Sequence, residues 1–265
     1  MLAVLMVWGA CQEPVEGCLD IDAVNFNAAT DFPCEFCCEY PTLTLALNYR
    51  AGLENFNINA PFEMQNGDSI IFTRAAFYVS DLSLIRNNEA FMPIDTIVLY
   101  EKVDDMLDSF TFLGNVGLIN RRSFNINMGS FEESGLFDAV SLRFGLNESM
   151  NNQPIDRIPN QNKLAIQADS MHTFTPDGGY IFLKFDLVFP VTNSSRQVTI
   201  TAADMPPVIE QLLPFQSIQG VNKTLNLAID YLAWIEGVDF QNDADDVVRQ
   251  KIVNNTANAW LFSQD

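Results

Sequence analysis

The chain has 265 residues, 34 acidic and 14 basic, and its formal charge is -20 at pH 7. This charge excludes nucleic acid as a partner, because phosphate backbones are bound by an extended basic surface. A single histidine excludes any metal centre built from several imidazoles. Hydrophobic residues make up 48%, including 21 Phe, so a large core is available and wholesale disorder is excluded.

The start of the chain predicts export. Residues 1–10 are apolar but too short to span a membrane as a helix. They resemble the end of a bacterial lipoprotein signal, in which small residues, here Gly9 and Ala10, precede the cysteine that is lipidated after cleavage. We therefore expect Cys11 to be the lipid attachment site of a protein in the periplasm or on the cell surface, anchored to the outer membrane. The alternatives are a signal cut by an ordinary peptidase and a chance apolar start.

Residues 11–41 form an acidic segment that contains every cysteine of the chain: Cys11, Cys18, Cys34, Cys37 and Cys38. Residues 17–41 resemble the short GC-x-D cysteine repeat of certain secreted bacterial proteins. Export makes disulfides the default, so the last four cysteines predict two bridges, with three pairings open. Zinc is disfavoured by the adjacent Cys37 and Cys38 and by the oxidising compartment.

The same segment carries oxygen ligands of the kind that calcium prefers, closely spaced on a predicted loop. They are Asp20, Asp22, Asn25, Asn27 and Asp31. Their spacing is not that of an EF-hand, and no glycine lies within the loop. Calcium binding and a purely structural role both stay open.

Residues 42–265 predict an all-β domain, an antiparallel β-sandwich that follows the lipid-anchored module. Strict alternation places Leu43, Leu45 and Leu47 on one face of a strand at 42–49. Further short β-rich runs are separated by Gly, Asn, Asp and Pro clusters, which favours a sandwich. They lie at 69–73, 76–85, 96–100, 123–128, 139–146, 180–189, 197–201 and 224–231. A helix is predicted to start at Asp243 or Asp245, which could cap it, and a shorter one around 206–213.

Several of these segments resemble the MbnP-like family. Residues 76–84 resemble its YYISNI-x-L strand, residues 140–152 its I-x-F-x-IGVD…N segment, and residues 171–186 its M…GY-x-F-x-KLEG segment. The order of the motifs is kept over about residues 42–262. The resemblance implies an exported β-sandwich and, in some members, copper bound by histidines and by a tryptophan that a di-haem peroxidase-like partner oxidises to kynurenine.

The family's copper motifs are missing here, since there is no W-x-W before Gly179 and Tyr180 and no later H-x-G. One candidate remains in the segment where the family places its site: His172, flanked by Met171 and Asp169. Imidazole, thioether and carboxylate together could hold copper. The alternative is a loop histidine that binds nothing.

No nucleophile elbow, phosphate loop or zinc-protease motif occurs, and a pair of glycosidase carboxylates is left open by 34 acids. We expect no enzyme, but an exported lipoprotein with a binding or copper-handling role. The runner-up is a cell-surface module that binds protein or glycan and no copper. Expected partners are the di-haem peroxidase-like protein of the family, or an outer-membrane or surface protein.

Overall fold

A computed structural model describes residues 13–264 except 65, 104–105, 155–157, 159, 161, 166–169 and 174–178. Cys11 and Asp169, predicted above as lipid site and metal ligand, therefore lie outside the described residues. None of the helices among the described residues is long and apolar enough to cross a membrane.

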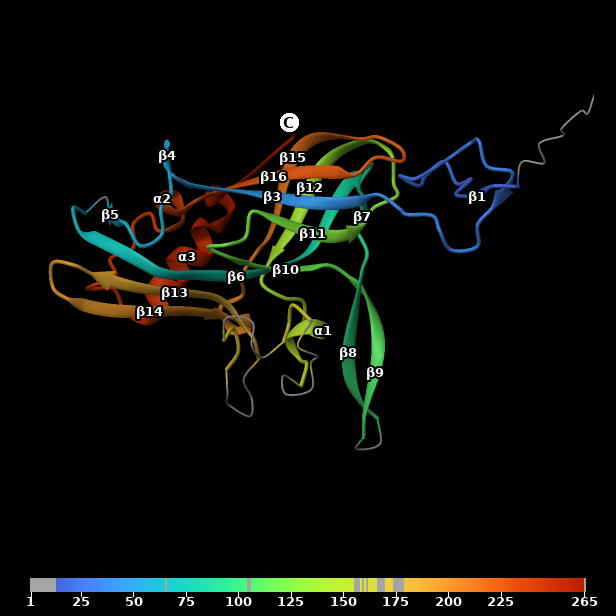
Figure 1. Ribbon diagram of the computed structural model, residues 1–265. Helices are drawn as coiled ribbons and strands as arrows, with labels where there is room; N and C mark the ends of the chain where they lie inside the picture. The colour runs from blue at the N-terminus through green and yellow to red at the C-terminus, as the bar shows by residue number, and fades with distance from the viewer. Residues whose placement is uncertain are drawn as a thin grey trace, which may run out of the picture.

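Two sheets face each other and enclose the core, which confirms the predicted β-sandwich (Figure 1). The larger sheet contains β5 (Pro61–Glu63), β6 (Ser69–Arg86), β7 (Glu89–Phe91), β10 (Val116–Asn120), β12 (Gly135–Phe144), β13 (Ile181–Phe189), β14 (Ser194–Thr201) and β15 (Val208–Ser217). The smaller sheet contains β3 (Thr42–Ala51), β4 (Glu54–Asn55), β11 (Asn125–Ser130), β16 (Lys223–Asp230) and β17 (Trp260–Ser263). Most pairs are antiparallel, but β3 and β16 pair in parallel.

β6 is the central strand of the larger sheet. It contains both strands predicted at 69–73 and 76–85, which form one continuous strand. Phe77 pairs with both β10 and β13, and Ser80 pairs with both β10 and β12. A strand has two edges, so β10 occupies one edge, while β13 and β12 follow each other along the other. Within the β12 pairing the register shifts between Ser80 and Ser83 of β6, which marks a bulge. Asp81 lies at this bulge with a φ of 53°, and its carboxylate binds Arg143 at 2.7 Å.

The helix predicted around 206–213 is wrong, because this segment belongs to the edge strand β15. Its exposure alternates along the strand, and it pairs antiparallel with β12. Pro214 falls within the register shift between the pairs Ala139–Leu212 and Phe137–Phe215. The missing N–H of a proline is tolerated at an edge or a bulge, so the residue does not interrupt the strand.

The predicted C-terminal helix is α3 (Asp245–Ala259), preceded by η2 (Ala202–Asp204) and α2 (Tyr231–Trp234) earlier in the chain. The prediction that Asp243 or Asp245 caps α3 is wrong, because the N-cap is Ala244, without a side-chain bond. The Asp243 carboxylate instead accepts hydrogen bonds from the Asp239 N–H and the Lys251 ammonium. α3 closes one end of the sandwich through Val248 and Ile252, which are fully buried in the core.

The strand predicted at 96–100 lies within β8 (Asp95–Val103), but the sequence missed its partner β9 (Met106–Gly114) and the hairpin that the two form, which projects away from both sheets (Figure 1). It also missed a second apolar cluster outside the sandwich core. Ile97 and Leu99 of β8 pack there with Tyr78 of β6 and with side chains of the segment between β12 and β13. The larger sheet is therefore covered on both faces.

Candidate functional site

The segment between β12 and β13 builds an outer layer on the larger sheet, and it is the segment that carries His172. The Gly145 N–H donates to the Tyr78 carbonyl at 2.8 Å, so the segment leaves β12 at the middle of β6. Gly145 has a φ of 94°, and a Cβ there would collide with the Phe182 ring, so glycine is required. α1 (Glu148–Asn151) follows, and Asn151 Oδ1 accepts from the Tyr180 N–H where the segment returns.

His172 forms an antiparallel bridge with Tyr180 and is 5% exposed. Two backbone hydrogen bonds flank this bridge, from Thr173 to Gly179 and from Ile181 to Met171. The Tyr180 hydroxyl donates to the Leu164 carbonyl at 2.7 Å, which ties the bridge to the rest of the outer layer. Burial, followed by the nearby Lys184 ammonium, lowers the pKa of His172 below its usual value, so the imidazole is neutral at neutral pH.

The donors predicted for copper do not converge among the described residues. Met171 is fully buried in the outer apolar cluster. Since successive side chains of extended backbone point to opposite sides, Met171 and His172 point apart. Among residues 13–264 with the gaps given above, no group of three or more His, Cys, Asp and Glu side chains could hold a metal ion. Met171 therefore does not join the imidazole of His172, and copper binding at this histidine stays a prediction.

A groove of about 640 Å³ lies where the root of the β8–β9 hairpin meets β10 and β11. Hydroxyl and amide side chains line it together with an apolar part made by Ile94, Leu118 and Ile126. The polar lining residues are Thr42, Asp95, Thr96, Ser123, Asn125, Asn127, Ser130 and Lys163. They come from four separate segments and share no sequence motif, which is why the sequence did not reveal the groove.

Lys163 fixes the shape of this groove by joining the outer layer to three strands. Its ammonium donates to the Val116 carbonyl at 2.7 Å and to the Asn127 carbonyl at 3.0 Å, and it lies 3.4 Å from the Asp95 carboxylate. These partners belong to β10, β11 and β8. A cation with three fixed acceptors holds the groove in one shape before any ligand arrives.

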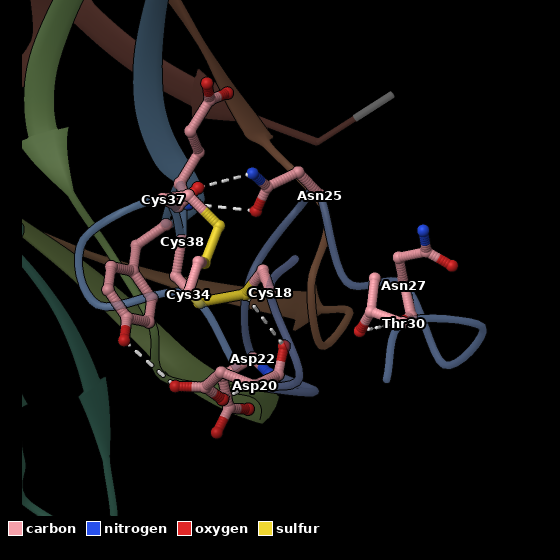
Figure 2. The surroundings of a disulfide bond; sticks show 11 residues. Cys18, Asp20, Asp22, Asn25, Asn27, Thr30, Cys34, Cys37 and Cys38 are labelled. Carbon is pink, nitrogen blue, oxygen red and sulfur yellow. Dashed lines mark hydrogen bonds between the residues drawn. A yellow bond between two sulfur atoms is a disulfide. The ribbon is translucent and has the colours of Figure 1, made fainter. Parts of the chain in front are cut away.

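The cysteine module is stapled by two disulfides, Cys18–Cys38 and Cys34–Cys37, so the predicted pair of bridges is confirmed and its pairing is decided (Figure 2). The short parallel strands β1 (Glu16–Gly17) and β2 (Phe32–Pro33) pair within it. The module is bound to the sandwich by the Gln219 amide, which donates to the Asp22 carboxylate at 2.8 Å.

Four of the five side chains predicted as calcium ligands accept hydrogen bonds within the module, and the fifth, Asp22, accepts the bond from Gln219 of the sandwich. Asp20 accepts from the Asp22 N–H at 3.0 Å and from the Tyr40 hydroxyl at 2.9 Å. Asn25 donates to the Cys37 carbonyl and accepts from the Glu39 N–H (Figure 2). Asn27 and Asp31 accept from nearby backbone N–H groups. A structural role is thus visible for each of them, and calcium binding there stays a prediction.

These features define a disulfide-stapled β-sandwich domain with an outer layer on one sheet. A family model described as MbnP matches residues 40–253, and the chain belongs to this family. A solved structure, MbnP from Methylosinus trichosporium, is similar at 12% identity and a TM-score of 0.44, covering 77% of this chain and 79% of that one. No curated protein matches the chain.

Proposed function

We propose that this member of the MbnP family is an exported, lipid-anchored protein that binds a ligand without transforming it. Two disulfides in a small acidic module support export, because such bridges persist in oxidising compartments. Metabolic labelling with palmitate tests the anchor. The wild type should be labelled and found in the membrane fraction. The Cys11→Ala variant should carry no label and be absent from the membrane fraction. A Cys11→Ala protein that stays in the membrane fraction would contradict the anchor.

The groove held open by Lys163 is the observation that carries the binding role. Preformed concave sites with a few fixed polar groups are where proteins bind small ligands. The hydroxyl and amide groups of Thr96, Asn125 and Ser130 can each donate and accept hydrogen bonds. This chemistry suits a hydroxyl-rich ligand, and we assign the groove to a glycan segment.

A non-catalytic role is supported by the charges in the same groove. Its described lining contains a single carboxylate, Asp95, and that carboxylate faces the Lys163 ammonium. Hydrolysis of a glycosidic bond by the usual route needs two carboxylic groups flanking the bond. The groove is therefore suited to holding a glycan rather than cleaving it.

A glycan array, followed by calorimetry with the oligosaccharide that binds best, tests this role. Thr96→Ala and Asn125→Ala should each weaken binding about fivefold, the loss of about one hydrogen bond. Asn48→Ala is the matched control, because Asn48 is exposed on β3 and lies outside the groove lining. Absence of binding to any oligosaccharide, or equal binding by all three variants, would rule out the glycan assignment.

Copper handling at His172 is the second candidate, and the lowered pKa favours it. Only neutral imidazole ligates a metal, and burial keeps His172 neutral. Cu(I) and Cu(II) titrations of untagged protein should show a site that His172→Ala loses. Equal binding by the variant would end this candidate, and with it the di-haem peroxidase-like partner that the family resemblance implies.

A further inference from the structure

The turn between β10 and β11 presents two adjacent arginines that form no salt bridge with the acidic side chains that the structure describes. In a chain with 34 acids and 14 bases, most cations of the described residues have an ion-pair partner. Arg121 and Arg122 are exposed, and among the described residues no salt bridge involves either of them. Two exposed guanidinium groups without an ion pair among the described residues of such an acidic chain point to an anionic partner from outside it.

The backbone of this turn is fixed before any ligand binds. The Ser123 N–H donates to the Asn120 carbonyl at 2.9 Å, and the Arg122 N–H donates to Asn120 Oδ1 at the same distance. The Tyr49 hydroxyl lies 2.6 Å from the Ser123 carbonyl and 3.1 Å from that of Asn120. Burial raises the pKa of Tyr49, so its hydroxyl stays protonated as a donor. The two arginines therefore project from a rigid base.

Beside the turn lies a hollow of about 290 Å³, whose lining includes Thr73, Arg74, Ala76, Asn120, Arg121 and Arg122. Ala76 is 1% exposed and pairs with Asn120 on β10 and with Lys184 on β13. Cross-strand partners share a face, so Lys184 lies on the same side of the sheet as this alanine. The small alanine side chain leaves the space, which Arg74, Arg121 and Arg122 line.

The charge of the hollow fits a compact dianion. One carboxylate, Asp186, faces this group at 3.6 Å from Arg74. The described lining of the hollow holds three arginines, Arg74, Arg121 and Arg122, and no carboxylate. Guanidinium groups bind oxyanions through two parallel N–H bonds, which suits a phosphate group with three free oxygens.

We propose that this hollow, the arginine hollow, binds the phosphate group of a soluble ligand. Its place in the fold favours a soluble ligand over a lipid headgroup. β3 (Thr42–Ala51) runs away from the cysteine module (Figure 1), and the hydroxyl of its Tyr49 contacts the arginine turn at the Ser123 carbonyl. Seven residues of strand span roughly 23 Å, so the hollow lies at the end of β3 remote from the module that would carry the lipid.

Calorimetric titration of the full mature protein with inorganic phosphate and with pyrophosphate tests the arginine hollow. The titration is run at physiological salt, where the Debye length is about 8 Å and diffuse attraction is screened. Saturable binding is expected, weakened about tenfold by Arg121→Ala or Arg122→Ala, since each removes a charge-assisted contact. Arg50→Ala is the control, because Arg50 is exposed on β3 and outside the hollow lining, and its binding should stay within about twofold of wild type.

Three outcomes would overturn the proposal: no saturable binding of either anion, equal binding by the Arg121 and Arg122 variants, or an equal loss in Arg50→Ala. A further arm uses non-acylated protein and vesicles of phosphatidylglycerol, with phosphatidylcholine vesicles as the reference. Arginine-dependent sedimentation with phosphatidylglycerol, without binding of the soluble anions, would assign the hollow to a lipid headgroup and overturn the soluble ligand. The glycan groove has a separate lining, so either site can fail without the other.

Discussion

The Asn115 side chain hydrogen-bonds to backbone groups of β6 beside its bulge. Replacing this side chain gives the sharpest test of the structure. Asn115 is fully buried. Its Oδ1 accepts from the Leu82 N–H at 2.8 Å, and its Nδ2 donates to the Leu82 and Pro93 carbonyls, both at 3.0 Å. One side chain thus satisfies three backbone groups and ties the root of the β8–β9 hairpin to β6.

Asn115→Ala leaves these three backbone groups buried without a partner. Each unsatisfied group costs about 1–3 kcal/mol, and partial relaxation or a trapped water recovers some of this. We expect the free energy of unfolding to fall by about 3–5 kcal/mol, a large part of the 5–15 kcal/mol typical of a domain. Asn48→Ala, at an exposed position of β3, should cost less than about 0.5 kcal/mol.

Urea denaturation followed by tryptophan fluorescence measures this difference, because Trp234 and Trp260 are both fully buried. Asn115→Asp adds a pH signature. At neutral pH the introduced carboxylate faces two carbonyl oxygens, so its folded-state pKa is raised, and the variant is destabilised. This loss should shrink as the pH falls toward about 4, where the carboxyl protonates and donates. A cost below about 1 kcal/mol for Asn115→Ala would refute the reasoning.

Replacing both Cys18 and Cys38 by Ala removes a disulfide of sequence separation 20 and should lower the free energy of unfolding of the module by about 3 kcal/mol. The module should then be cleaved faster in limited proteolysis, and an unchanged rate of cleavage would contradict this. Gln211→Ala frees the N–H and C=O of Phe262, which the glutamine amide binds across the sandwich edge, so stability should drop by about 1–2 kcal/mol and the Phe262 amide should exchange faster with deuterium. Unaltered exchange at that amide would show that the Gln211–Phe262 hydrogen bonds do not stabilise the folded protein. Because the pKa of His172 is lowered in the folded state, the folded protein binds a proton at this imidazole less readily than the unfolded chain does. The free energy of unfolding should therefore decline as the pH falls below 6.5, the ordinary pKa of histidine, and His172→Gln should remove this part of the pH dependence. Identical pH profiles would show that the imidazole is not buried in solution.

The sequence alone determined the features that depend on local pattern. β3 follows from the alternation of Leu43 and Leu45, because period-two spacing places both on the buried face. The sandwich follows from the number of short strands with turn residues between them. The clustering of the cysteines predicted a stapled module, and the family motifs, spread along the chain in order, predicted the family that the match over residues 40–253 shows.

Tertiary structure decided what depends on neighbours remote in sequence. The segment around Leu212 has the composition of a short helix, yet it is an edge strand because β12 offers its free edge. Cys18 pairs with Cys38 because the chain folds back over the residues between them, which no spacing rule fixes. The groove at Lys163 and the arginine hollow each gather residues from separate strands. A sequence read in order cannot place Arg74 beside Arg122, because only the pairing of β6 with β10 brings them together.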